Sequence, residues 1–139
     1  MVRGVFAVVV ALMLSSCSHG TEISEPQINV HPDEAFTLEV GQTADVEQGR
    51  LRVTFEKVLE DSRCPADVVC VHAGNARIAL DVVHDGTPAD IQLDTRREAV
   101  SAVVGDFVIA RVALHPYPIS ERPQTEPSVY EATLKVTRR

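Results

Sequence analysis

The sequence predicts an all-β fold: a single antiparallel β-sandwich or barrel, with an immunoglobulin-like arrangement as one form of it. From Ala35 onward, apolar residues recur at every second position in several short runs, which is the period of a strand with one buried face. Turn signals separate these runs, as in small sandwiches and barrels. Trp is absent and aromatic residues make up 4% of the chain, so the core must consist mainly of Val, Leu, Ile and Ala.

Three alternating runs come first, and each is closed by a turn or by a break in phase. Gly41-Gln42 and Gln48-Gly49 supply the two turns, while the phase shift at Val58-Leu59 indicates a β-bulge or the end of a strand. The apolar positions of these runs are Phe36, Leu38, Val40, Ala44, Val46, Leu51, Val53 and Phe55.

The second half of the domain continues the same pattern. Asp85-Gly86 is a strong hairpin signal, and residues 107–114 form a nearly continuous apolar run that is typical of a central strand. Residues 95–104 are the one stretch whose pattern is compatible with a helical turn. The remaining alternating positions are Ala76, Ile78, Leu80, Val82, Ala89, Ile91, Leu93, Tyr130, Ala132, Leu134 and Val136.

Segment 115–129 holds four of the eight prolines and cannot form a central strand. We interpret it as a rigid, exposed connection, with a partner-binding loop in polyproline conformation as the functional alternative. Residues 17–34 are polar and carry two further prolines, so we predict a flexible stalk there and place the folded domain at 35–139. A short edge strand at Ile28–Val30 is the alternative for part of the stalk.

The N-terminal segment predicts the location of the protein. Arg3 is followed by ten apolar residues, Val5 to Leu14, and then by Ser15-Ser16-Cys17. This run is too short to span a bilayer, which needs about 20 residues, and it has the organisation of a signal peptide. The Leu14-Ser15-Ser16-Cys17 sequence resembles the lipobox of bacterial lipoproteins. An ordinary secretory signal, in which Cys17 is incidental, is the alternative.

The lipobox resemblance implies cleavage before Cys17, which removes residues 1–16, and acylation of the Cys17 thiol and of the new amine. Two or three acyl chains would hold the protein on a membrane without a spanning helix, whereas one chain binds only reversibly. Ser18 is not the Asp associated with retention in the inner membrane of enteric-type bacteria. We therefore expect the periplasmic face of the outer membrane where the cell has two membranes.

Composition argues against nucleic acid as a partner. The chain has 13 Lys and Arg against 20 Asp and Glu. Removal of Arg3 with the signal peptide leaves 12 basic residues and a net charge of −8, whereas nucleic-acid binding needs clustered positive charge.

The most distinctive motif of the domain is Asp61-Ser62-Arg63-Cys64-Pro65 followed by Cys70-Val71-His72-Ala73-Gly74. Cys64 and Cys70 form an even pair in an exported chain, so a disulfide is expected. Gly74 permits a positive φ or a close backbone approach before the next strand. The motif resembles a recurrent domain of small bacterial exported proteins and lipoproteins that carry DSRCP and CxxAG. The family commonly has Trp where this chain has His72, and the resemblance implies a fold rather than an activity.

Two more specific functional hypotheses are alternatives to a structural disulfide in this segment. A redox dithiol is disfavoured, because such pairs are usually spaced Cys-x-x-Cys at a helix N-terminus. A zinc or copper site formed by Cys64, Cys70 and His72 has suitable ligand types, but an oxidising compartment opposes it. His72 and His84 flank an extended segment and are not expected to share a site.

The sequence lacks the nucleophile-elbow, zinc-protease, P-loop and dinucleotide-binding motifs. We therefore expect a non-enzymatic, cofactor-free envelope lipoprotein that presents a small β-domain to another envelope protein. The alternative is a small-ligand or metal-handling lipoprotein that uses the Cys64–Gly74 region, with Asp61, Arg63 and His72 as ligand contacts. Asp61 and Arg63 have a structural interpretation as well, as a pair that organises the turn.

Overall fold

The computed structural model describes residues 26–95, 100–121 and 126–139, and over these ranges the chain is built from β-strands and one short 3-10 helix. The predicted all-β class is confirmed. The predicted signal peptide and Cys17 lie outside the described residues. In the described ranges, no helix has the length and hydropathy that a bilayer crossing requires.

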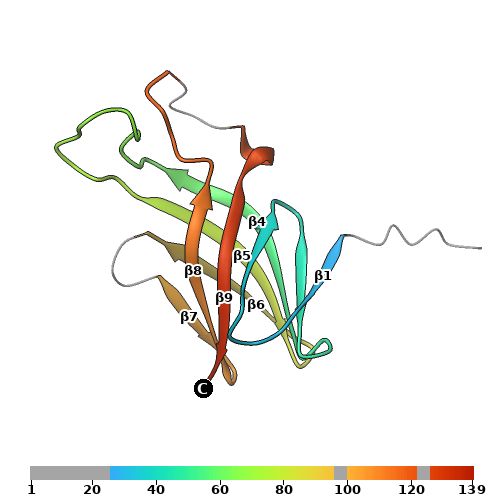
Figure 1. The fold of residues 1–139 in the computed structure, drawn as a ribbon. Coiled ribbons are helices and arrows are strands. Elements are labelled where there is room, and N and C mark those ends of the chain that lie inside the picture. Colours follow the sequence, from blue (N-terminus) through green and yellow to red (C-terminus); the bar gives the residue numbers. More distant parts are fainter. Residues whose placement is uncertain (1–25, 96–99, 122–125) are drawn as a thin grey trace, which may run out of the picture.

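Two sheets pack face to face, which confirms the sandwich, and they do not close into a barrel (Figure 1). The five-stranded sheet has the order β1 (Gln27–Val30), β3 (Thr43–Val46), β4 (Leu51–Asp61), β5 (Ala76–His84) and β6 (Thr87–Asp94). The four-stranded sheet has the order β2 (Ala35–Glu39), β9 (Glu131–Arg138), β8 (Phe107–His115) and β7 (Ser101–Val104). Strands β3 to β6 form one continuous meander, an order that differs from the ABED and CFG sheets of immunoglobulin domains.

The core lies between the sheets and is made by the alternating residues. In β2 and β9 every second side chain is buried, and the other side chains face solvent. The largest fully buried side chains are Phe55, Phe107, Leu38, Leu51, Ile78, Leu80, Leu93, Ile109 and Leu134.

The predicted turns and the phase break are confirmed. Asp85 and Gly86 both have positive φ, 45° and 80°, as a two-residue hairpin of the mirror-image type requires. The phase shift in β4 is a pair of register shifts against β5, between Phe55 and Lys57 and between Val58 and Glu60.

Three expectations need correction. The predicted stalk, 17–34, is wrong at its C-terminal end, because residues 27–30 form the edge strand β1 that was the alternative there. This strand pairs with β3 in parallel, so the sandwich is not purely antiparallel. The helical turn expected within 95–104 is wrong for 101–104, which pair with β8 as strand β7. Residues 96–99 lie outside the described residues.

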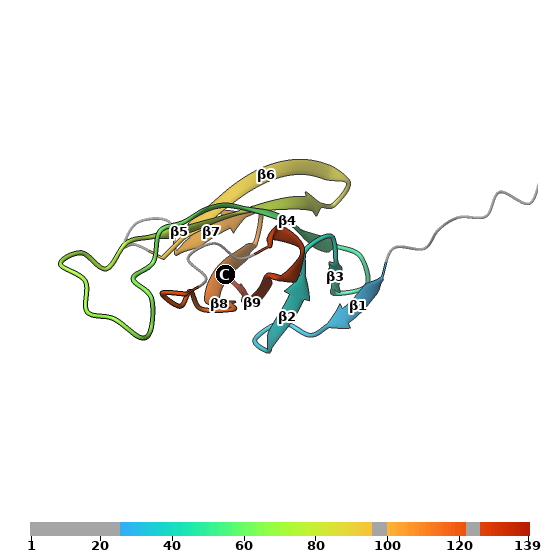
Figure 2. The same ribbon diagram turned by 90° about the horizontal axis from the view of Figure 1, so that it is seen from above.

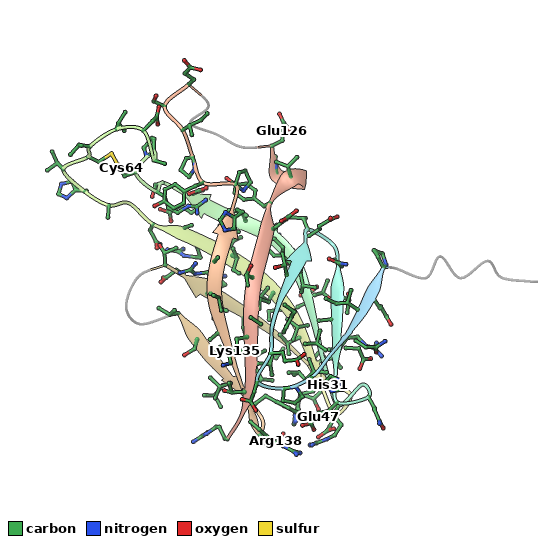
Figure 3. All side chains as sticks on the ribbon, in the orientation of Figure 1. His31, Glu47, Cys64, Glu126, Lys135 and Arg138 are labelled. Carbon is green, nitrogen blue, oxygen red and sulfur yellow. A yellow bond between two sulfur atoms is a disulfide. The ribbon has the colours of Figure 1, made fainter. Side chains whose placement is uncertain are left out.

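An ionic network closes one end of the sandwich. Asp106, in the β7–β8 turn, accepts bonds from His84 Nε2 at 2.9 Å and from Arg50 and Arg138 at 3.4 Å. Burial opposes the ionised form of Asp106, but the His84 bond, a backbone hydrogen bond and the two guanidinium groups outweigh it and lower its pKa. Glu47 and Arg138 mark this end in Figure 3, and Cys64 marks the opposite end.

Candidate functional site

The loop between β4 and β5, residues 62–75, extends well beyond the sheets (Figure 2). A disulfide joins Cys64 to Cys70 with Cα atoms 5.9 Å apart, which confirms the predicted pairing. The crosslink closes the outer part of the loop and restricts its conformations.

Backbone pairing continues from the sheet into the base of this loop. Ser62 N donates to Asn75 O at 2.7 Å, and Cys64 N donates to Ala73 O at 2.9 Å. Gly74 lies between these rungs with a φ of 69°, and a Cβ at this position would meet the carbonyl oxygen of Ser62 at 1.6 Å. The predicted need for glycine is therefore confirmed, because no side chain fits between the two backbone segments.

Asp61 and Arg63 form a nearly buried ion pair at the root of the loop. Arg63 Nε and Nη2 donate to the two oxygens of Asp61, both at 2.7 Å, and the two side chains are 6% and 8% exposed. Tyr130 Oη donates to Asp61 Oδ2 at 2.8 Å. Burial by itself would raise the pKa of Asp61, but the hydrogen bonds from Arg63 and Tyr130 and the charge of Arg63 outweigh it and lower the pKa.

Arg63 also holds the proline-rich segment. Its Nη1 donates to Leu114 O at 2.7 Å, and its Nη2 donates to Pro116 O at 2.9 Å. The guanidinium carbon lies 4.5 Å from the centre of the Tyr117 ring, in cation–π contact. The Asp61–Arg63 pair therefore organises more than its own turn, because Arg63 also fixes the proline-rich segment against the β4–β5 loop.

Further contacts join the two loops into a single unit. Ala66 N donates to Pro118 O at 2.9 Å, and Ser120 N donates to Asp67 Oδ1 at 2.8 Å. The Ser120 hydroxyl also donates to Asp67, and this bond lowers the pKa of the Asp67 carboxyl. We call residues 62–75 together with 116–121 the loop platform.

The loop platform exposes several apolar side chains. Val69 and Val71 are almost completely exposed, at 102% and 95%, and neighbouring apolar side chains add to them. These neighbours are Val68, Tyr117 and Ile119. Single exposed apolar residues are ordinary, but a group of them on a crosslinked and hydrogen-bonded support is typical of an interaction surface.

A groove of about 480 Å³ lies beside the loop platform. Arg63 and Tyr117 line it from the platform, Thr95 from the end of β6, and Arg111 and Val112 from β8. Arg111 is partly buried, and its Nε makes a long hydrogen bond of 3.4 Å to Asp94 O. Burial lowers the pKa of Arg111 and the charge of Arg63 lowers it further, against the opposing effect of the Asp94 carboxylate.

The structure does not gather the three predicted ligand contacts in one place. Arg63 lines the groove, whereas Asp61 and His72 are not part of its lining, and His72 is exposed on the β4–β5 loop. The two sulfurs of the hypothetical metal site are bonded to each other. Within the described ranges, no three His, Cys, Asp or Glu side chains are grouped so that they could hold a metal ion.

Sequence analysis missed Arg111 and Tyr117. Arg111 was visible as the one charge in an apolar strand, which is a signal for a polar group with a specific neighbour. Tyr117 carried no such signal, because its position depends on the contact between two distant loops.

Comparison with protein-family models, with curated proteins and with solved structures found no match.

Proposed function

We propose that this chain is a membrane-anchored envelope lipoprotein whose loop platform binds another envelope protein. The observation that carries the proposal is the apolar surface of Val68, Val69, Val71, Tyr117 and Ile119 on a loop pair that is braced from within. Apolar side chains that are held in place before binding lose little conformational entropy when a partner covers them.

The bracing supports this function more than a simple role in stability. The disulfide, the Arg63 bonds and the Asp67–Ser120 bonds all lie outside the sandwich core. Their common effect is to hold two exposed loops against each other, in addition to the stability that the Asp61–Arg63 pair provides.

The position of the loop platform favours a protein partner over the bilayer that would hold the anchor. Strand β1, which follows the lipobox segment, lies at the opposite side of the molecule from the disulfide loop (Figure 2). The platform also carries the exposed acidic residues Asp67 and Glu121, which an anionic lipid surface would repel.

Photo-crosslinking in living cells tests the proposal. A photoreactive amino acid at position 69 of the full chain should give one dominant protein adduct, and the same group at position 103 on β7 serves as the control. Val103 is exposed at 56% but lies outside the loop platform. Val71→Asp should abolish the adduct formed from position 69. Adducts to lipid alone, or the same protein adducts from both positions, would contradict the proposal.

The alternative function, binding of a small ligand, has one observation in its favour. The groove of about 480 Å³ lies within the usual size range of small-molecule sites. Purified protein that retains a small molecule through dialysis, together with the absence of any crosslinked protein, would favour this alternative.

A further inference from the structure

Part of β8 has no strand beside it on the side that faces the groove. Strand β7 pairs with β8 only over Phe107–Ala110, and one more bond joins Arg111 N to Val100 O. Figure 1 shows β7 beside the lower part of β8 only. Strand β9 pairs with the other side of β8, but among the described residues no strand lies beside 112–115 on the side of β7.

An open stretch of sheet edge can take up an additional strand. Arg63 already bonds two carbonyl groups near the end of this edge, those of Leu114 and Pro116. These two carbonyls are two residues apart, which is the spacing at which a neighbouring strand would bond them. The side chain therefore occupies the top of the edge, and the stretch below it borders the groove.

Positive charge and apolar surface border this stretch together. Arg111 lies at its lower end, partly buried and near the second guanidinium group of Arg63. Val112 is 54% exposed and Tyr117 is 48% exposed, so the groove has apolar rims. Asp61 neutralises Arg63, so Arg111 is the source of positive charge in this groove, within a chain of net charge −7.

We propose that the partner enters this groove as an extended segment beside Val112 and Ala113 of β8, below the Leu114 carbonyl that Arg63 occupies, with an acidic side chain placed against Arg111. This inference rests on the proposed function, because the groove and the loop platform share Arg63 and Tyr117 and would be covered by the same partner. Main-chain bonds to the edge would supply affinity, and the carboxylate would fix the register. An aliphatic residue next to the acid would pack on Val112.

A library of random linear peptides displayed on phage, selected against the full mature protein, provides the probe. Selected peptides should share one Asp or Glu next to β-branched or aliphatic residues. For a selected peptide, Arg111→Gln should weaken binding about 10- to 100-fold, as expected for a hydrogen bond to a charged group. Replacement of the peptide's acid by its amide should weaken binding to a similar extent.

Two further variants make the result specific to the groove. Arg52→Gln removes an exposed arginine from the outer face of β4 and should leave peptide affinity unchanged. Val112→Glu places a negative charge on the rim and should also weaken binding, without removing a contact from the fold. Thermal unfolding should confirm that Arg111→Gln and Val112→Glu are folded. Selection without a shared acid, no selection above an unrelated protein, or unchanged affinity in Arg111→Gln would each overturn the inference.

The crosslinking experiment separates this inference from the proposed function. If Val71→Asp abolishes the adduct from position 69 and Arg111→Gln does not weaken it, the partner binds the platform but not the groove, and the inference fails alone. If neither variant affects the adduct, the proposed function itself fails. Loss of the adduct in Val71→Asp and in Arg111→Gln would support the proposed function and the inference about the groove.

Discussion

At the scale of single residues, Arg63 has the largest structural role outside the core. It uses one guanidinium group to neutralise a buried carboxylate and to bond two carbonyl oxygens of a segment more than 50 positions away in the sequence. A lysine could not reproduce this geometry, because an ammonium group is a point charge and lacks the planar fork of the guanidinium.

Arg63→Ala should therefore destabilise the protein by about 3–5 kcal/mol, since it leaves the Asp61 carboxylate buried without its charged partner, held by the Tyr130 hydroxyl and a long bond of 3.4 Å from the backbone N of residue 63. Arg77→Ala is the matched control, because Arg77 pairs with Glu60 on the surface at 3.6 Å and should cost less than about 1 kcal/mol. Urea unfolding of both variants gives the measurement. Equal losses in the two variants would show that the buried pair has no special role.

Asp81 and Asp90 form an unfavourable pair on the outer face of the five-stranded sheet. They lie directly opposite each other in the β5–β6 ladder. The hydrogen bond shared with Asp90 raises the pKa of Asp81, and burial and the negative charges of Glu56 and Asp90 raise it further. A folded-state pKa above the unfolded value means that this pair favours folding only at low pH and loses that contribution as the pH rises through the folded-state value.

Asp90→Asn should consequently stabilise the protein at pH 7, by about 0.2–1 kcal/mol, because it removes one of two like charges that face each other. The gain should shrink at low pH, where protonation of Asp81 removes one of the two facing charges. Thermal melts at the two pH values measure this difference. A gain of the same size at both pH values would rule out charge repulsion as its cause.

At the scale of elements, alternation in the sequence was sufficient to predict the core-facing side of most strands. β1 and β7 were harder to place, since each has only four residues and depends on a neighbouring strand for its backbone bonds. The disulfide was predictable from two cysteines in a chain whose sequence predicts export. The groove was not predictable, because its lining comes from four separate segments of the sequence that only the folded sandwich brings together.

The disulfide loop gives the prediction at this scale. The double variant Cys64→Ser/Cys70→Ser should lose roughly 2.4 kcal/mol, the loop-closure entropy of a seven-residue ring. Cleavage by a protease should then become fast within the disulfide loop, while the strands remain protected because their backbone bonds are unchanged. Mass spectrometry without reduction checks the pairing in the wild type. Free thiols in protein taken from the envelope, or a variant with unchanged protease resistance, would contradict a bracing role.

At the scale of the whole molecule, the two ends of the sandwich differ in chemistry. One end is closed by the ionic network around Asp106, and the other presents the apolar loop platform (Figure 3). Charged side chains that are paired with one another satisfy their own hydrogen bonds and need no partner. Exposed apolar groups lower their free energy when they are covered. This asymmetry supports the assignment of binding to the loop platform.

The proposed anchor provides the last prediction. Cys17→Ser should move the protein from the membrane fraction to the soluble fraction, since it removes the thiol that would carry the first lipid and leaves too short an apolar run to span a bilayer. The double variant Cys64→Ser/Cys70→Ser is the control: it removes two cysteines but keeps Cys17, so it should remain in the membrane fraction. Labelled palmitate should be incorporated into the wild type and the control only.

The fold limits how far the sandwich could lie from a membrane that holds Cys17. Strand β1 begins at Gln27, so the nine residues between Cys17 and the sheet span at most about 32 Å. A lipid on Cys17 would thus keep the sandwich close to the bilayer, while the loop platform lies on the side away from β1. Equal release of wild type and Cys17→Ser into the soluble fraction would contradict the proposed lipid anchor. The platform would then have to find its partner by free diffusion.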